Sequence, residues 1–200
     1  NDVGQLCNWG SYIKNEIISD CNSNEVSLWD SCYSIVNTTE LDLSGYNLSG
    51  SIDPEIGTLV NLNYINLRFN NLTGSIPESL GNLTNLTTLN LSDNFLEGEI
   101  PVELESLANL ENLYLHNNQL SGEVPNIFHQ MDNLLHLTLF ENQLNGNIPE
   151  SICNIYDNIE YLGLYSNLLC PPYPNCITSE DLGSQDTSNC DFAFIKKGNN

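Results

Sequence analysis

Residues 62–86, LNYINLRFNNLTGSIPESLGNLTNL, contain a pattern that recurs along the chain at intervals of 24 residues. The positions that recur are those of Ile65, Leu67, Asn70, Leu72, Gly74, Ile76 and Pro77. Shifts of 24, 48 and 72 residues place an aliphatic residue, Asn, Gly or Pro at the matching position each time, as far as Pro149. A fixed period of this kind predicts a solenoid, in which each repeat forms one coil and buries its apolar face against its neighbours.

Two less regular copies extend the pattern to six repeats. The first begins near Thr38 and has Tyr46 where the other copies have Asn. The last runs from Glu160 to about Leu169 and lies 25 residues beyond its predecessor, so one residue is inserted around residues 155–158. The expected organisation is an N-terminal cap over residues 1–37, repeats over residues 38–169, and a C-terminal cap and tail over residues 170–200.

Each repeat is expected to contribute one short β-strand, because the LxL core alternates between two faces. Successive strands then pair in parallel into one curved sheet, which gives an α/β-type repeat solenoid. The following Asn is expected to point inward and to bond backbone groups of its own turn and of the adjacent coil, since buried amides must be satisfied. Gly allows a bend with positive φ, and Pro ends the extended stretch. The predicted ladder consists of Asn70, Asn94, Asn118, Asn142 and Asn167.

The chain is strongly acidic, with 26 acidic residues, four Lys and Arg, and a formal net charge of −22. Neither nucleic acid nor an anionic membrane is an expected partner, because both require clustered Lys and Arg. The charge indicates solubility or, alternatively, capture of a cation or a basic partner. No apolar run of 18 residues occurs, so membrane insertion is not expected. The opening residues NDVGQLCNW resemble a mature or trimmed start rather than a signal peptide.

Cysteines are confined to the two ends of the chain, at positions Cys7, Cys21, Cys32, Cys153, Cys170, Cys176 and Cys190. This distribution predicts disulfide-stapled caps and an oxidising compartment. The pairs we expect are Cys21–Cys32, Cys153–Cys176 and Cys170–Cys190, although four C-terminal cysteines allow three pairings. Cys7 is then an odd thiol or a member of a different pair. No Cys-x-x-Cys occurs and no His lies near either group, so a zinc site is not expected.

The two ends carry further apolar residues. Trp9 and Trp29 are candidates to cover the first coil, and Tyr12–Ile18 has a weak helical spacing. Residues 191–200 resemble a loose tail that could dock or take part in an interface.

The motif LxxLxxLxLxxNxLxGxIPxxLxxL, spelled by residues 62–86, resembles the plant-specific class of leucine-rich repeats. This class is found in polygalacturonase-inhibiting proteins, receptor-kinase ectodomains and secreted repeat proteins of algae and marine microbes. The resemblance covers about residues 38–169, and Trp29, Cys32 and VNTTELDL are similar to the N-terminal cap of the class. NLLCPPYPNC and QDTSNC are similar to the C-terminal cap of its microbial members, whereas the seventh cysteine fits neither pattern. The resemblance implies a secreted, right-handed curved solenoid with an extra β segment on the convex side and a ligand-binding concave face.

Residues that flank the strand leucines are expected to point outward on the concave face. The aromatic and His residues at these positions form a larger group toward the C-terminal half, Tyr114, His116, His136, Phe140, Tyr161 and Tyr165, and a smaller group, Tyr64, Arg68 and Phe69. Aromatic residues beside His or Arg are typical interface anchors, and aromatic faces beside Asn also suit sugars. The alternative is that exposed Tyr simply has good β propensity.

Metal binding and catalysis have weaker support. His116 and His136 are offset by about 13 Å along the strand, which is too far to share one ion. Asp93 and Glu141 are expected in register two strands apart, and too few oxygen ligands converge there for Ca²⁺. An open, shallow face would not raise either carboxyl pKa as an inverting glycosidase requires. We therefore expect neither an enzyme nor a cofactor.

Six Asn-x-Ser/Thr sequons are candidate N-glycosylation sites, at Asn37, Asn47, Asn71, Asn82, Asn85 and Asn90. Most of them arise from the NLT and NLS tripeptides of the repeat itself, so they are weak evidence for glycans. A glycan on Asn90 would lie on the concave face and move binding toward the aromatic C-terminal half.

These observations favour a secreted or surface-displayed extracellular module that binds a protein or carbohydrate ligand on its concave face. The alternative is a structural or assembly protein of a surface layer, appendage or virion that self-associates. Ice binding, which some members of this class perform, requires a flat and regular ladder of Thr or Asn. The outward columns of this sequence are too mixed for that role.

Overall fold

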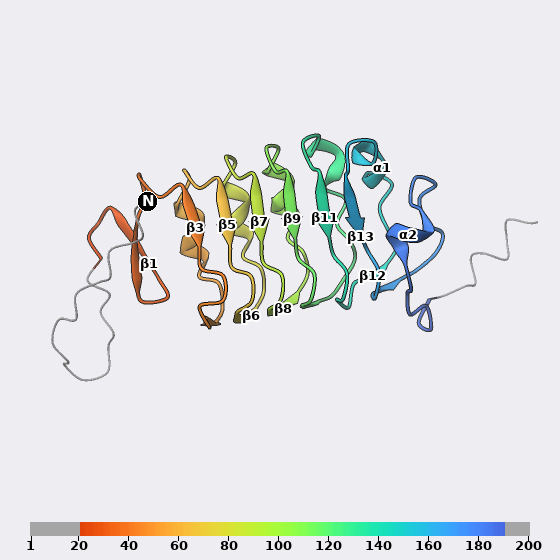
Figure 1. Cartoon of the computed structure of the whole chain (residues 1–200), viewed down its shortest axis with the longest axis horizontal. Coiled ribbons are helices and arrows are strands. Elements are labelled where there is room, and N and C mark those ends of the chain that lie inside the picture. The colour runs from red at the N-terminus through yellow and green to blue at the C-terminus, as the bar shows by residue number, and fades with distance from the viewer. Residues whose placement is uncertain (1–20, 191–200) are drawn as a thin grey trace, which may run out of the picture.

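The computed structural model describes residues 21–190, and these residues form a curved row of stacked coils (Figure 1). One parallel six-stranded sheet, in the order β13-β11-β9-β7-β5-β3, runs along one side. Its strands are β3 (Glu40–Asp42), β5 (Tyr64–Asn66), β7 (Thr88–Asn90), β9 (Asn112–Tyr114), β11 (His136–Thr138) and β13 (Tyr161–Gly163). The solenoid and its parallel sheet are those that the repeat predicts.

A second set of short parallel strands follows the inward Asn of each coil. The set comprises β4 (Ser49–Gly50), β6 (Asn71–Gly74), β8 (Phe95–Gly98) and β10 (Gln119–Leu120), with a separate pair formed by β12 (Asn145–Gly146) and β14 (Leu168–Leu169). Gly74 and Gly98 end their strands at φ 74° and 81°, where a side chain would be strained. The recurring Gly therefore turns the chain toward the opposite side of the coil.

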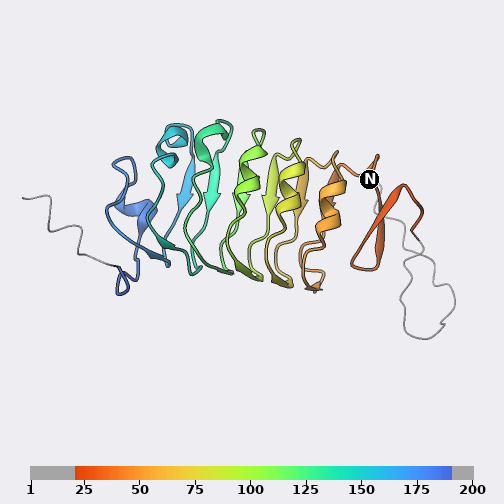
Figure 2. The same ribbon diagram turned by 180° about the vertical axis from the view of Figure 1, so that it is seen from behind.

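Short helices cover the convex side (Figure 2). They are the 3₁₀-helices η1 (Pro54–Thr58), η2 (Glu78–Asn82), η3 (Val102–Ser106) and η4 (Phe128–Gln130), and the α-helix α1 (Ile152–Ile155). Neighbouring 3₁₀-helices pack so closely that a Cβ added at Gly81 would lie 2.5 Å from the carbonyl oxygen of Glu103. The one-residue insertion lies where α1 replaces a 3₁₀ turn, so the extra residue is absorbed on this side.

Buried leucines and isoleucines from every coil form one continuous core. The five asparagines predicted to point inward do so. Asn94, for example, donates to the carbonyls of Leu67 (2.9 Å) and Leu91 (3.2 Å) and accepts from the N–H of Leu72 (3.1 Å). It also donates to the carbonyl of Ser92 (3.1 Å), so its amide joins its own coil to the preceding one and bonds four backbone groups.

The ladder continues past the last recognisable repeat. Gln185 donates to the carbonyls of Leu164 (2.9 Å) and Leu182 (2.7 Å) and accepts from the N–H of Leu169 (3.2 Å). These bonds have the same arrangement as those of each Asn. Residues 181–186 therefore pack as a further, degenerate coil in which Gln replaces Asn.

A second series of asparagines, one per coil, reaches across the convex edge. Asn109 donates to the carbonyl of Thr84 at 2.8 Å, and its equivalents are Asn61, Asn85, Asn133 and Asn158. Each bond joins a side chain to the preceding coil. The solenoid is thus tied together at two edges.

An antiparallel hairpin, β1 (Glu25–Leu28) and β2 (Ser31–Ser34), covers the N-terminal end of the core. Val26 and Leu28 are buried, and Trp29 packs partly against the core from the turn. The Cys21–Cys32 disulfide, predicted from the sequence, spans the hairpin. The expectations for Cys7, Trp9 and Tyr12–Ile18 concern residues outside the described range.

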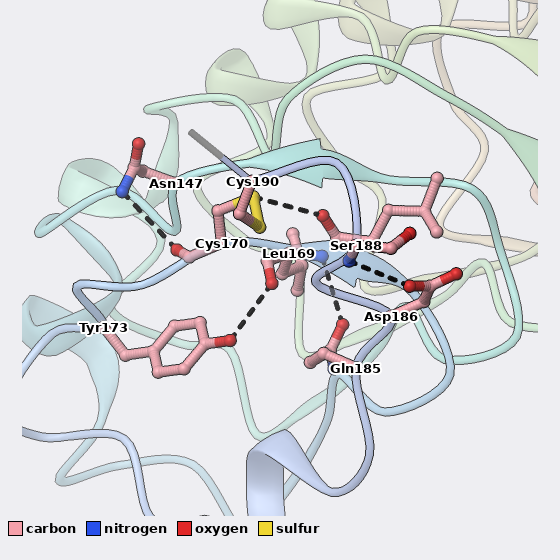
Figure 3. Close-up of a disulfide and its surroundings, with 9 residues drawn as sticks. Asn147, Leu169, Cys170, Tyr173, Gln185, Asp186, Ser188 and Cys190 are labelled. Atoms are coloured by element: carbon pink, nitrogen blue, oxygen red, sulfur yellow. Dashed lines mark hydrogen bonds between the residues drawn. A yellow bond between two sulfur atoms is a disulfide. The ribbon is translucent and has the colours of Figure 1, made fainter. Parts of the chain in front are cut away.

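Two disulfides close the C-terminal end, Cys153–Cys176 and Cys170–Cys190, which are the pairs predicted from the sequence. Around Cys170–Cys190, the Tyr173 hydroxyl donates to the carbonyl of Leu169 at 3.0 Å (Figure 3). The short helix α2 (Ser179–Leu182) has a capping box made by Thr178 and Asp181. The tail over residues 191–200 lies outside the described range.

Within residues 21–190, no helix has the length and hydrophobicity needed to span a membrane.

Candidate ligand-binding face

Outward-facing residues of the six-stranded sheet line up in rows across the strands. The first row is Glu40, Tyr64, Thr88, Asn112, His136 and Tyr161, and the second is Asp42, Asn66, Asn90, Tyr114, Thr138 and Gly163. The residue between the two rows is a buried Leu or Ile in every strand. Backbone bonds beyond the strands, such as Asn117 N–H to the Phe140 carbonyl, keep neighbouring coils in step, so the rows continue after each strand ends.

Three rings from neighbouring coils stack face to face just beyond the strands. The ring centroids of His116 and Phe140 lie 4.4 Å apart at an interplanar angle of 18°, and those of Phe140 and Tyr165 lie 4.4 Å apart at 11°. These distances are close to the ~4.8 Å between neighbouring strands, so the sheet itself sets the stack. Nδ1 of His116 lies 2.7 Å from the hydroxyl of buried Thr138, which fixes the imidazole ring.

Gly163 makes room for two of the aromatic rings. A Cβ at this position would lie 2.9 Å from Cδ1 of Phe140 and 3.2 Å from Cε1 of Tyr161. Every other member of the row carries a side chain. Phe140 and Tyr161 therefore converge over the one coil that has glycine in the second outward row, and Tyr161 remains 46% exposed there.

Two more rings extend the group toward the middle of the sheet. The ring centroid of Tyr114 lies 6.4 Å from that of His116 in an edge-on arrangement, and 6.3 Å from that of His136. All six members of the larger predicted group are thus in one continuous patch. We call it the aromatic cluster, made of Tyr114, His116, His136, Phe140, Tyr161 and Tyr165.

The smaller predicted group is joined to the aromatic cluster through Asp93. The guanidinium of Arg68 lies 4.1 Å from the ring centroid of Phe69, and its Nε donates to Asp93 at 2.8 Å. Asp93 also accepts from the Asn117 amide at 2.8 Å and lies 3.8 Å from Nε2 of His116. Asp93 therefore links the two predicted groups, a role that the sequence did not indicate.

The environment shifts the pKa of both ionisable partners in this link. Burial alone would raise the pKa of Asp93, but hydrogen bonds from Arg68 and Asn117 outweigh it and lower the pKa below 3.8. For His116, burial lowers the pKa below 6.5, and the nearby Asp93 carboxylate offsets only part of that effect. Asp93 is therefore ionised and His116 neutral at neutral pH.

Glu141 differs from Asp93 in having no partner. It follows Phe140 at φ 54° and is exposed, and within residues 21–190 its carboxylate makes no hydrogen bond or ion pair. Burial lowers the pKa of His116 and raises that of Tyr165, and the negative charge of Glu141 opposes the first shift and adds to the second, so Glu141 lies close to both ends of the ring stack. Sequence reasoning weighed Glu141, together with Asp93, as a calcium ligand and as a catalytic carboxylate, and not as a partner of the ring stack.

Side chains with metal-binding chemistry converge at one place in the described part of the chain. The only set of three converging His, Cys, Asp or Glu side chains in residues 21–190 is Cys21, Glu25 and Cys32, and its two sulfurs form a disulfide. Asp93 is bonded to Arg68 rather than facing Glu141.

The six sequons lie within the described residues, and several of their amides already have structural contacts. The Asn85 amide donates to the carbonyl of Val60 at 3.0 Å, and the Asn71 amide donates to Oδ1 of Asn47 at 2.7 Å. Asn90 lies on the concave sheet and accepts from Ser92. Asn37 and Asn82 are exposed.

Two family descriptions match the repeats. One described as "Leucine Rich Repeat" matches residues 37–59, 61–83 and 133–155, and one described as "Leucine Rich repeats (2 copies)" matches residues 84–129. Comparison with curated proteins gives no match.

Solved structures of plant proteins share the fold. One is the ectodomain of the receptor kinase GASSHO1/SCHENGEN3 from Arabidopsis thaliana, in complex with CASPARIAN STRIP INTEGRITY FACTOR 2. It is 36% identical, with a TM-score of 0.69, and the match covers 75% of this chain and 18% of the ectodomain chain. A chain of the BIR3–SERK2 complex from Arabidopsis thaliana is 30% identical with a TM-score of 0.58, over 78% of this chain and 81% of that one. A plant ice-binding protein is 35% identical, with a TM-score of 0.53. The match covers 62% of this chain and 39% of the ice-binding protein. This chain spans only about a fifth of several of the receptor chains that it matches.

Proposed function

Because this chain belongs to the plant-type leucine-rich repeat proteins, we propose that it is an extracellular binding module that holds a peptide or protein segment on its concave face. The aromatic cluster is the observation on which this proposal rests. Six ring side chains from three neighbouring coils form one surface, and three of them, Tyr114, Tyr161 and Tyr165, carry hydroxyl groups beside apolar rings. Aromatic residues of this kind provide much of the energy of protein interfaces.

Other features support an extracellular recognition role rather than an enzymatic one. The three disulfides are typical of oxidising compartments. The neighbouring structures include the receptor kinase HAESA in complex with the peptide hormone IDA, and a complex of two proteins. We keep residues 38–169 as the proposed repeat domain, with residues 1–37 and 170–200 as its caps.

Ice binding has less support. The outward rows combine acidic, aromatic, amide and hydroxyl side chains, as in the row from Glu40 to Tyr161. A mixed row does not present the repeated spacing of one chemical group. The likeness to an ice-binding protein therefore supports the fold more than this function.

The test is selection of a displayed random-peptide library on the immobilised full chain, followed by binding of the selected peptides to variants. We expect most selected peptides to lose binding to Phe140→Ala/Tyr165→Ala and to retain it on Phe95→Ala. Phe95 is a matched control, because it is 49% exposed and lies in β8 of the other sheet. Selected peptides that bind all three proteins equally would refute the proposal. If the chain binds polysaccharides on a glycan array and binds no library peptide, the ligand is a carbohydrate rather than a peptide.

A further inference from the structure

We propose that the segment held on the aromatic cluster is basic, with an Arg or Lys side chain placed on the stacked rings. This inference rests on the proposed function and adds the chemistry of the partner. It follows from the charges around the cluster, which the fold alone does not dictate.

The concave face contains almost no positive charge. Arg68 is the single Lys or Arg between residues 21 and 190, and its guanidinium is bonded to Asp93 at 2.8 Å. The chain as a whole has a formal charge of −22. An acidic segment would therefore be repelled, and a basic one attracted over a distance of about 8–10 Å in ordinary salt.

The aromatic cluster has unpaired or exposed carboxylates at its borders. Glu141 is exposed beside Phe140 and makes no ion pair or hydrogen bond within the described residues. Glu160 is 67% exposed at its side chain and lies 3.7 Å from Nε2 of His136. Ring faces and carboxylates are thus combined in one place, with no resident cation between them in residues 21–190.

The ring stack can accept a cation at its C-terminal end. One face of Tyr165 is stacked on Phe140, and on the far side the next coil contributes Gly183, whose added Cβ would lie 2.5 Å from the Cβ of Tyr165. A glycine there leaves no side chain to cover the ring. A guanidinium laid on this ring would gain cation–π attraction and remain within reach of the Glu141 carboxylate. The molecule already uses the same pairing at Arg68 and Phe69.

Discrimination from other ligands follows from the same groups. A neutral sugar would stack on Tyr161 and Tyr165 without any use for Glu141. An acidic segment would place its carboxylates beside Glu141 and Glu160. Only a basic segment is attracted to both the rings and the carboxylates.

The experiment uses a nine-residue peptide of alternating Arg and Gly, and the same peptide with neutral citrulline at each Arg. Both are titrated into the full chain at 150 mM salt, with binding measured by fluorescence anisotropy and mapped by NMR. We expect the Arg peptide to bind at least tenfold more tightly and to shift the resonances of Phe140, Tyr161 and Tyr165. We expect Glu141→Gln to weaken binding about three- to fivefold, and Tyr165→Ala to weaken it similarly.

Glu105→Gln is the matched control, because Glu105 is exposed in η3 on the convex side and the change removes the same charge. Equal weakening by Glu105→Gln and Glu141→Gln would mean diffuse attraction and would overturn the inference. Citrulline binding equal to Arg binding, or no binding of the Arg peptide, would also overturn it. The proposed function would survive those results if library peptides without Arg or Lys still required Phe140 and Tyr165.

Discussion

At the scale of single residues, Asn94 shows how one amide holds two coils together. The side chain is buried and satisfies the carbonyls of Leu67 and Leu91 and the N–H of Leu72. Asn94→Ala should leave the N–H of Leu72 without this partner, whereas the carbonyls of Leu67 and Leu91 still accept from Asn70 and Asn118. A buried unsatisfied group costs about 1–3 kcal/mol, so we expect a loss of about that size in the free energy of unfolding, measured with urea.

Asn109→Ala provides the comparison. Asn109 is exposed and makes one bond, to the carbonyl of Thr84, which water can replace. The expected loss is about 0.5–1 kcal/mol. Equal losses for the two variants would show that burial of the ladder does not determine its contribution.

The imidazole of His116 gives a prediction for pH dependence. Burial holds its pKa below the ordinary value of 6.5, so the folded state binds the proton less readily than the unfolded state. Stability should therefore fall as pH drops below about 6.5, until the folded pKa is passed. An NMR titration should give a pKa below 6.5 for His116, and a still lower one in Asp93→Asn, where a negative charge is lost. A pKa above 6.5 would contradict the geometry described for this site.

At the scale of elements, the convex helices depend on glycine at their contacts. A Cβ at Gly81 of η2 would lie 2.5 Å from the backbone oxygen of Glu103, which cannot rotate away. Gly81→Ala should therefore cost about 3 kcal/mol by overpacking. Gly163→Ala meets ring atoms that can turn, so we expect about 1 kcal/mol and a changed near-UV circular dichroism spectrum. The reverse order in thermal or urea unfolding would be inconsistent with this packing.

The C-terminal disulfides act on a whole element. Cys153–Cys176 closes a loop of 23 residues and joins α1 to the segment before α2. Its removal in Cys153→Ser/Cys176→Ser should reduce the free energy of unfolding by about 2–4 kcal/mol, mainly because the unfolded chain gains freedom. Urea unfolding of the full chain measures the effect, and an unchanged midpoint would exclude a stabilising role for this disulfide.

The elements show how far sequence reasoning extends. The LxL cores, the inward asparagines and the glycine bends follow from a period that many residues share, so chance agreement is small. The coil over residues 181–186 was missed because it has Gln185 in place of Asn and lacks the leucine spacing. The hairpin of β1 and β2 was missed because its strands are only four residues long. The second asparagine series, such as Asn85 and Asn109, was visible at the same period and was overlooked.

At the scale of the whole molecule, net charge opposes compaction. A formal charge of −22 on 200 residues produces self-repulsion, which dissolved salt screens. We expect the melting temperature to rise by a few degrees between 20 mM and 300 mM NaCl, measured by calorimetry. A fall over that range would mean that attractive ion pairs outweigh the repulsion.

The sequence predicted which residues make up the candidate site better than it predicted the contacts between them. All nine predicted concave residues lie on the sheet or just after its strands, because strand phase alone fixes which positions face outward. The link through Asp93 depended on side-chain directions at φ 55°, which periodicity does not specify. The space at Gly163 was a signal in the sequence, since it is the only glycine in its row.

Length variation in this fold has a preferred location. The coil with one extra residue keeps its strand paired, and Asn167 still bonds the carbonyls of Leu139 and Leu164 at 3.0 Å. The extra residue is accommodated at α1, on the side away from the six-stranded sheet. Insertions and deletions that arise by mutation can therefore accumulate on the convex arc while the concave rows stay aligned. The same arc is where an engineer could add a tag or a loop without disturbing the concave rows.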